Sequence, residues 1–165
     1  MKNSLISLMI LAALATGCGV TSNQSSEQRA ASLDNMAAMI ESGNYVYTIQ
    51  SIAPTGHRTI QSTTPYTMKV VNGNYEASLP YFGRAYQASY GGDGGIEFSG
   101  TPEDLKITRN TKKNSLIVTF SLTESNDKFN CTLQVGYSGY ATLIINSQNR
   151  QSISYYGVVT GPEGT

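Results

Sequence analysis

Few side chains in this sequence could do chemistry, and their spacing forms no catalytic pattern. The one histidine, His57, lies in a turn rich in proline and glycine, and a metal site or a nucleophile pair would need partners that this position lacks. No serine sits in a nucleophile elbow, and the glycines of 91–95 lack the Lys and Ser/Thr of a phosphate loop. Asp93 is a single carboxylate, whereas a calcium loop supplies several oxygen ligands. We therefore expect a protein that is not an enzyme and needs no metal or cofactor.

Cys18 is the residue with the clearest chemical fate. It ends the segment LATGC at 14–18, which follows Lys2 and the apolar run 5–14. A basic start, an apolar run and small residues at the cut are the parts of a secretory signal. A cysteine directly after the small residues resembles the lipobox of bacterial lipoproteins, in which the sulfur takes a diacylglyceryl group. The resemblance implies that residues 1–17 are a signal peptide and that lipid on Cys18 attaches the chain to a membrane.

The N-terminal segment also allows alternatives to a lipid anchor. Ala15 stands where a lipobox carries a bulkier residue, and residues 13–15 match the A-x-A pattern of ordinary cleavage, which would give a soluble secreted protein. A transmembrane anchor needs about 20 apolar residues, and this run is far shorter. The residues after Cys18 lack the acidic run that surface-export signals carry in some Gram-negative lipoproteins. We therefore expect an outer-membrane anchor facing the periplasm, with the cell surface as the alternative.

The composition indicates one β-rich exported domain behind a flexible spacer. Residues 18–27 are rich in Gly, Ser and Gln with almost no large apolar side chain, so they form a tether. We expect a single domain over 28–160 and a frayed tail over 161–165. The formal net charge is zero at pH 7, which gives no reason to expect nucleic-acid binding. Eleven tyrosines, 16 glycines and no tryptophan suit strands joined by many turns.

A single helix is predicted at the start of the domain. Leu33, Met36 and Ile40 recur at helical spacing within 27–42, and Gly43 is placed to end the helix. We expect this helix to pack against the sheet or to close one end of it.

The rest of the domain is predicted as about eight to ten short strands joined by tight turns. Asn72-Gly73 suits a type I′ hairpin turn because both central residues need a positive φ. No helical crossover separates the strands, so the sheet must be antiparallel and mostly a meander. Such a sheet hides its edges by closing or by folding into two layers. We expect a mainly β fold, with a barrel-like or strongly curved sheet and one N-terminal helix; a β-sandwich is the alternative.

Two further segments have predicted roles in this sheet. In 128–135 apolar and polar residues alternate, which places Cys131 on the buried face of a strand, where its thiol packs as a small hydrophobe. Glu103-Asp104, after Pro102, is interpreted as a turn or the start of a helical turn.

The alternation fails between residues 79 and 98, and this stretch holds the candidate site. Connections of such length that are dense in aromatics and glycines are often functional. The aromatic rings supply large flat faces, and the one arginine adds a planar cation that can stack or bind a carboxylate. The candidate ligand-binding residues are Tyr81, Phe82, Arg84, Tyr86 and Tyr90.

The same stretch carries a family resemblance. The run LPYFGRAY at 79–86, with GGIEF at 94–98, resembles a family of exported proteins and lipoproteins from Bacteroidota-type bacteria that is classed as a domain of unknown function. The similarity covers roughly residues 44–157. It implies an export context and assigns no catalytic residue.

Two interpretations of the aromatic stretch compete. In the structural one, the rings cap the core and Arg84 satisfies buried backbone or a carboxylate such as Glu97. In the functional one, the stretch lines a cavity mouth or forms a recognition surface. Our first hypothesis is a non-catalytic, lipid-anchored envelope protein that binds a small apolar ligand, a lipid or a peptide through residues 81–90. The alternative is a scaffolding lipoprotein with a solid core that binds another envelope protein. Glycan binding by tyrosine stacking is a third option, against which the lack of tryptophan counts.

Overall fold

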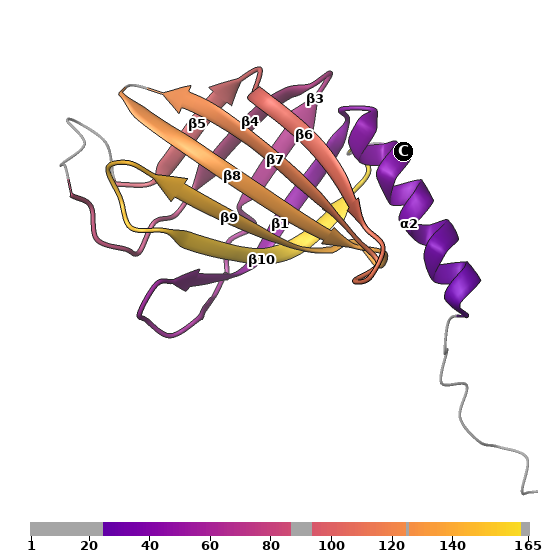
Figure 1. The fold of residues 1–165 in the computed structure, drawn as a ribbon. Coiled ribbons are helices and arrows are strands. Elements are labelled where there is room, and N and C mark those ends of the chain that lie inside the picture. Colours follow the sequence, from indigo (N-terminus) through magenta and orange to yellow (C-terminus); the bar gives the residue numbers. More distant parts are fainter. Residues whose placement is uncertain (1–24, 87–93, 125, 163–165) are drawn as a thin grey trace, which may run out of the picture.

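The computed structural model describes residues 25–86, 94–124 and 126–162, which form one helix and ten strands. Nine strands make one antiparallel path that curls into a half-barrel, and the short strand β2 pairs beside it with β1 (Figure 1). The elements are α2 (Ser26–Glu41), β1 (Tyr45–Pro54), β2 (Ile60–Gln61), β3 (Thr67–Val71), β4 (Asn74–Leu79), β5 (Ile96–Gly100), β6 (Glu103–Asn110), β7 (Ser115–Glu124), β8 (Asp127–Gly136), β9 (Tyr140–Ser147) and β10 (Ile153–Thr160). The predicted mainly β fold with a curved sheet and one N-terminal helix is therefore confirmed.

The strand order is that of a meander opened at one point. The path runs β5-β4-β3-β1-β10-β9-β8-β7-β6, so β1 pairs with β10 and the first and last strands of the chain meet in mid-sheet. Strands β5 and β6 follow each other in sequence but lie at the two ends of the path. Strand β6 is an edge strand with charged residues, a bulge between Glu103 and Lys106, and Pro102 just before its start. Such features usually keep an edge strand from pairing with other chains.

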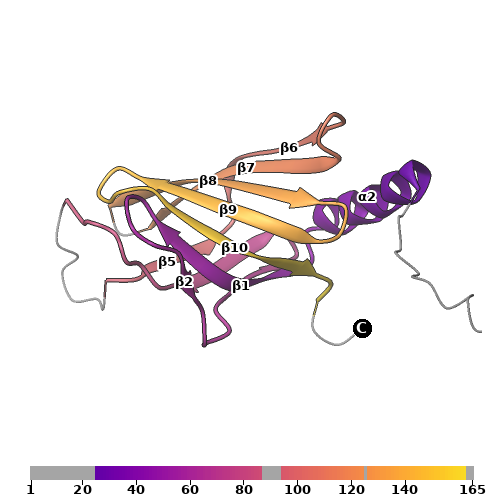
Figure 2. The same cartoon turned by 90° about the horizontal axis from the view of Figure 1, so that it is seen from below.

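Helix α2 begins and ends as its sequence dictates. The Ser25 hydroxyl accepts a hydrogen bond from the Gln28 amide at 3.2 Å, and the Gln28 side chain accepts one from the Ser25 amide at 2.9 Å, which forms a capping box. Gly43, with φ +67°, follows the helix. The helix buries Leu33, Met36 and Ile40, and Figure 2 shows it at one end of the curled sheet.

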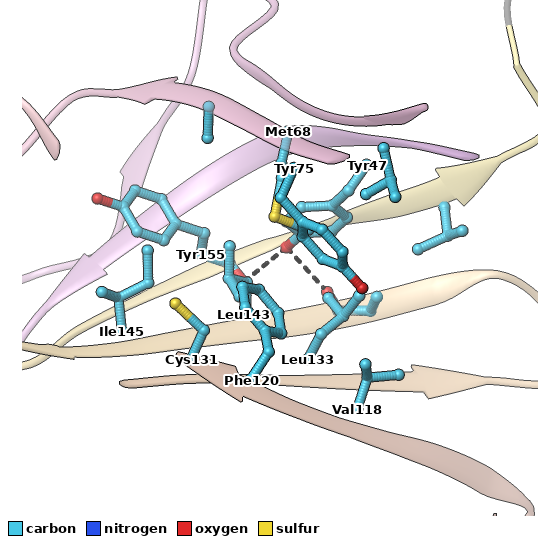
Figure 3. Packing of buried hydrophobic residues seen from close by; sticks show 14 of the residues in the cluster. Tyr47, Met68, Tyr75, Val118, Phe120, Cys131, Leu133, Leu143, Ile145 and Tyr155 are labelled. Atoms are coloured by element: carbon cyan, nitrogen blue, oxygen red, sulfur yellow. Dashed lines mark hydrogen bonds between the residues drawn. The ribbon is translucent and has the colours of Figure 1, made fainter. Parts of the chain in front are cut away.

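The space inside the curl is filled by one apolar cluster (Figure 3). The rings of Tyr75 and Phe120 reach across it, with centroids 4.5 Å apart. The buried tyrosine hydroxyls find partners there: that of Tyr47 donates to the Tyr155 carbonyl at 2.7 Å, and that of Tyr45 donates to the Tyr75 hydroxyl at 3.1 Å. A buried hydroxyl without such a partner would be costly, so these bonds let tyrosine serve as core.

Several local predictions can be compared with the structure. Asn72 and Gly73 have φ of +51° and +77°, as the type I′ turn requires. Cys131 is buried as predicted, and burial raises the pKa of its thiol to about 12. The prediction for Glu103-Asp104 was wrong: both belong to β6, where Glu103 pairs with Ser121 and Asp104 takes a φ of +53° at the bulge. Pairing with β7 outweighed the local helix-start signal.

Candidate functional site

Residues 80–86 cross the loop end of the sheet, opposite α2, and are held there by main-chain hydrogen bonds (Figure 1). The Tyr86 amide donates to the Asn149 carbonyl at 2.7 Å, and the Gln151 amide donates to the Arg84 carbonyl at 3.0 Å. These two bonds flank an antiparallel bridge between Ala85 and Arg150. The segment thus has the pairing of a short strand although it lies outside the named strands, and we call residues 80–86 the clamped segment.

Tyr81 faces inward and fixes the turn of the clamped segment. Its hydroxyl lies 2.8 Å from the Arg84 carbonyl and 2.9 Å from the Gln151 carbonyl, and its single proton is donated to these two acceptors. Burial raises the pKa of this phenol, while the bond to Gln151 and the charge of Arg150 act in the opposite direction. A Cβ at Gly83 would overlap this hydroxyl, so any larger residue there would force the Tyr81 side chain to shift.

Arg150 lies beneath Tyr81 and joins three segments of the chain. Its guanidinium carbon is 5.5 Å from the Tyr81 ring centroid, a cation–π distance. Its Nε lies 3.6 Å from an Asp127 carboxylate oxygen, and the two side chains are only 10% and 11% exposed. Its Nη1 donates to the carbonyls of Gly94 and Gly95. The guanidinium therefore ties the clamped segment to the start of β8 and to the residues that lead into β5.

Two hydroxyls complete this network. The Ser147 hydroxyl lies 2.7 and 2.8 Å from the two Asp127 carboxylate oxygens, and its oxygen also accepts the Asn149 amide at 2.9 Å. The Tyr155 hydroxyl donates to the Pro80 carbonyl at 2.9 Å and so attaches the start of the clamped segment to the core. These bonds give partners to polar groups that are partly removed from solvent.

The other predicted site residues point away from this network. Phe82 is 49% exposed, Tyr86 is 68% exposed, and Arg84 is exposed as well. The structural interpretation had Arg84 satisfy buried backbone or a carboxylate such as Glu97. Arg84 is exposed, Glu97 accepts a hydrogen bond from the Ser78 hydroxyl at 3.3 Å, and the stacked and hydrogen-bonded arginine is Arg150. The predicted set is thus divided into an inward Tyr81 and an outward group of Phe82, Arg84 and Tyr86, the exposed triplet. Tyr90 and Cys18 lie outside the described residues.

Sequence reasoning did not single out Arg150, Asp127 or Ser147. These residues belong to different strands and loops, so no local spacing connects them, and an Arg among Gln and Ser in 148–152 gives no sign of burial.

The other described residues whose side chains could take part in chemistry are scattered over the structure. His57 is exposed in the turn after β1, where its amide donates to the Pro54 carbonyl at 3.2 Å. Within residues 25–86, 94–124 and 126–162, no three His, Cys, Asp or Glu side chains gather as they would around a metal ion. Nor does the described part of the chain contain a helix long and apolar enough to cross a membrane.

Comparison with known proteins identifies the family. The model of the DUF4251 family, a domain of unknown function, matches residues 27–159. A crystal structure of a DUF4251 family protein from Bacteroides eggerthii is similar over 83% of this chain and 92% of that chain, with a TM-score of 0.61 and 19% sequence identity. No curated protein matches. The chain belongs to the DUF4251 family, which confirms the family predicted from the sequence, and the crystal structure shares its fold.

Proposed function

We propose that this chain is a non-catalytic, lipid-anchored protein of the cell envelope that binds another envelope protein through the exposed triplet of the clamped segment. The observation that carries the proposal is the contrast between the two sides of residues 80–86. On the inner side, the Tyr81 hydroxyl is hydrogen-bonded to the Arg84 and Gln151 carbonyls. On the outer side, Phe82, Arg84 and Tyr86 are exposed to solvent.

The composition of the exposed triplet supports a protein partner. Aromatic residues and arginine are enriched at protein interfaces, because a large ring or a planar guanidinium contributes much contact area for few rotatable bonds. Arg84, placed between Phe82 and Tyr86 in sequence, would suit a partner surface that carries a carboxylate beside apolar groups.

The clamp supports the same proposal on energetic grounds. A loop that orders only on binding loses conformational entropy at that moment, which weakens the complex. The bridge between Ala85 and Arg150 and the bonds of Tyr81 order the segment beforehand. Binding at the exposed triplet would then cost mainly the ordering of its side chains.

A carrier that holds a small apolar ligand inside the curl is less well supported. The interior is occupied by the rings of Tyr45, Tyr75 and Phe120 and by the other residues of the apolar cluster. A ligand in that space would have to displace packed side chains, and cores respond to such overpacking with strain. A small ligand could still bind on the outer surface, and the experiment below distinguishes this case.

The position of the clamped segment fits an anchored protein. The clamped segment and the start of α2 lie at opposite ends of the molecule in both views (Figures 1 and 2). A lipid on Cys18, joined through the tether to the start of α2, would hold the helix end toward the membrane. The exposed triplet would then face away from the lipid, where a partner protein is accessible.

Site-specific photo-crosslinking in living cells tests the proposal. The full chain with Phe82→p-benzoylphenylalanine should give a discrete cross-linked protein band on irradiation. The matched control places the same probe at Val71, which is also exposed but lies in the hairpin at the helix end. A band from Phe82 that Arg84→Glu abolishes would support the proposal. Cross-linking that is equal at both positions, or a band from neither, would contradict it, and a small adduct at Phe82 would indicate the ligand carrier instead.

A further inference from the structure

A second surface lies on the outer face of β8, β9 and β10. Buried and unburied residues alternate along these strands, so every second side chain points away from the core. Among the described residues, the outward positions of β9 and β10 carry no charged side chain, and the only one on β8 is Lys128 at its start, which pairs with Glu103 at 3.4 Å. In Figure 1 these strands lie in front, with β3 and β4 behind them.

Two exposed tyrosines occupy neighbouring positions on this face. Tyr140 is 65% exposed and Tyr156 is 42% exposed. Tyr156 pairs with Thr142, and Tyr140 pairs with Val158, so the two tyrosines are diagonal neighbours on adjacent strands, within reach of one another. We call this surface the tyrosine face; its residues are Gln134, Tyr140, Thr142, Tyr156 and Ser51.

The polar members of the tyrosine face lie in one row across four strands. Gln134 pairs with Thr142, Thr142 pairs with Tyr156, and Tyr156 pairs with Ser51. Amide and hydroxyl groups both donate and accept hydrogen bonds without carrying charge. A ligand that crosses the strands along this row would meet neutral donors and acceptors beside two aromatic rings.

We propose that the tyrosine face binds an uncharged glycan chain. Sugar hydroxyls need neutral groups that donate and accept, which the row supplies, and the apolar C–H faces of sugar rings can pack on exposed aromatic rings. The described outward positions of β9 and β10 carry no charged side chain. This surface is therefore electrostatically complementary to a neutral ligand rather than a charged one.

Other occupants fit this face less well. Protein interfaces are enriched in aromatic residues, methionine and arginine and depleted in serine. This face has the tyrosines, but the described outward residues of β9 and β10 include serine and threonine and neither Met nor Arg. An anionic lipid surface attracts clusters of Lys and Arg, which those positions also lack. A small apolar molecule needs a concave site, and this is the outer side of a curled sheet.

Affinity electrophoresis of the full chain tests the proposal. Native gels containing mixed-linkage β-glucan, xylan, galactomannan or dextran serve as neutral probes, and alginate serves as the charged comparison. At least one neutral polysaccharide should retard the chain, and Tyr140→Ala or Tyr156→Ala should raise the dissociation constant for it about tenfold, since stacking on an aromatic ring contributes on that order. Tyr156→Phe, which keeps the ring, should lose much less.

Two controls separate this site from the rest of the molecule. Phe82→Ala should leave polysaccharide binding unchanged, so that failure of the glycan proposal and failure of the proposed function remain distinguishable. Migration unaffected by all four neutral polysaccharides, or retardation by alginate alone, would overturn the glycan proposal. So would a chain that sediments as a dimer and becomes a monomer in Tyr156→Ala, because the tyrosine face would then be an interface between two copies.

Discussion

Two arginine–tyrosine contacts lie at opposite ends of the curled sheet and differ in what surrounds them. At the loop end, Arg150 stacks on Tyr81 at 5.5 Å and also contacts Asp127 and two carbonyls. At the helix end, Arg29 of α2 stacks on Tyr137 at 5.6 Å, and its Nε is buried without a hydrogen-bond partner among the described residues. The same contact is part of a polar network at one end and nearly isolated at the other.

The difference follows from how each end is held. Helix α2 is attached by the burial of Leu33, Met36 and Ile40, so its position does not depend on Arg29. The clamped segment turns Phe82 and Tyr86 outward, which leaves it little apolar burial of its own. Hydrogen bonds and a buried ion pair replace that burial, and they allow the segment to be ordered while its large side chains stay exposed.

The largest predicted effect comes from removing the arginine at the loop end. Arg150→Met leaves the Asp127 carboxylate buried beside a neutral side chain, and breaking a buried pair in this way costs about 3–5 kcal/mol of unfolding free energy. Arg29→Met, the matched change at the helix end, should alter stability by about 1 kcal/mol at most. Urea denaturation of both variants measures the difference, and equal losses would remove the contrast between the two ends. Arg150→Lys, which keeps the charge, should fall between Arg150→Met and the wild type.

A smaller loss is expected when the turn of the clamped segment is crowded. The added Cβ of Gly83→Ala would overlap the Tyr81 hydroxyl, so Tyr81 must move and weaken its bonds to two carbonyls. We expect a cost of about 1–3 kcal/mol, as for other overpacked sites. The matched control is Gly94→Ala, where a Cβ meets no atom within 4 Å but takes up a strained positive φ of +80°. If Gly83→Ala unfolds at the same temperature as the wild type, Tyr81 does not have the fixed position described.

Removal of the Tyr81 hydroxyl alone should have a still smaller effect. Tyr81→Phe keeps the ring on Arg150 but loses the hydrogen bond shared by two carbonyls, at a cost of about 1 kcal/mol. Tyr86→Phe removes an exposed hydroxyl and should stay within about 0.5 kcal/mol of the wild type. Chemical denaturation of the two variants should rank them in this order, and the reverse order would mean that the inward and outward tyrosines have been misassigned.

Alkaline pH offers a check on the same tyrosine. Burial raises the pKa of Tyr81 above that of an unfolded tyrosine, near 10, so the folded chain keeps this proton at a pH where the unfolded chain loses it. Its contribution is fully present below about pH 10 and is lost as the pH rises further. Unfolding free energy measured against pH should therefore fall less steeply for Tyr81→Phe than for the wild type. Parallel curves would show that Tyr81 is not buried.

The smallest effect on stability should accompany the largest effect on binding. Phe82→Ala and Tyr86→Ala remove exposed rings, so each should change the unfolding free energy by about 0.5 kcal/mol or less. If the exposed triplet is the interaction surface, Tyr86→Ala should recover far less of the cross-linked partner when the photoprobe replaces Phe82. A loss of stability like that of Arg150→Met would mean that these rings belong to the core.

The strand architecture could be predicted because patterns among residues close in sequence determine it. Alternation along 128–135 placed Cys131 in the core, and Asn72-Gly73 specified its turn, both from residues close in sequence. The break in alternation after Leu79 likewise located the clamped segment. Only Glu103-Asp104 was misread, because pairing with β7 decides its conformation and no local signal reports that pairing.

The division of the candidate site could not be predicted. Tyr81 and Tyr86 look alike in sequence, and one is turned inward only because Arg150 and Gln151, about 70 residues away, lie beneath it. The aromatic stretch suggested that rings mattered, yet it held no information on which rings meet the core. The tyrosine face escaped notice for a similar reason, since Tyr140 and Tyr156 become neighbours only through the register of β9 and β10.

Amide hydrogen exchange of the full chain tests most directly whether the clamped segment is ordered before any partner binds. The Tyr86 amide, bonded to Asn149, and the Gln151 amide, bonded to Arg84, should be protected in the free wild-type protein. In Arg150→Lys both should lose protection, while the amides of β8 and β9 keep theirs. A Tyr86 amide that exchanges in the wild type as fast as in an unstructured peptide would contradict the account.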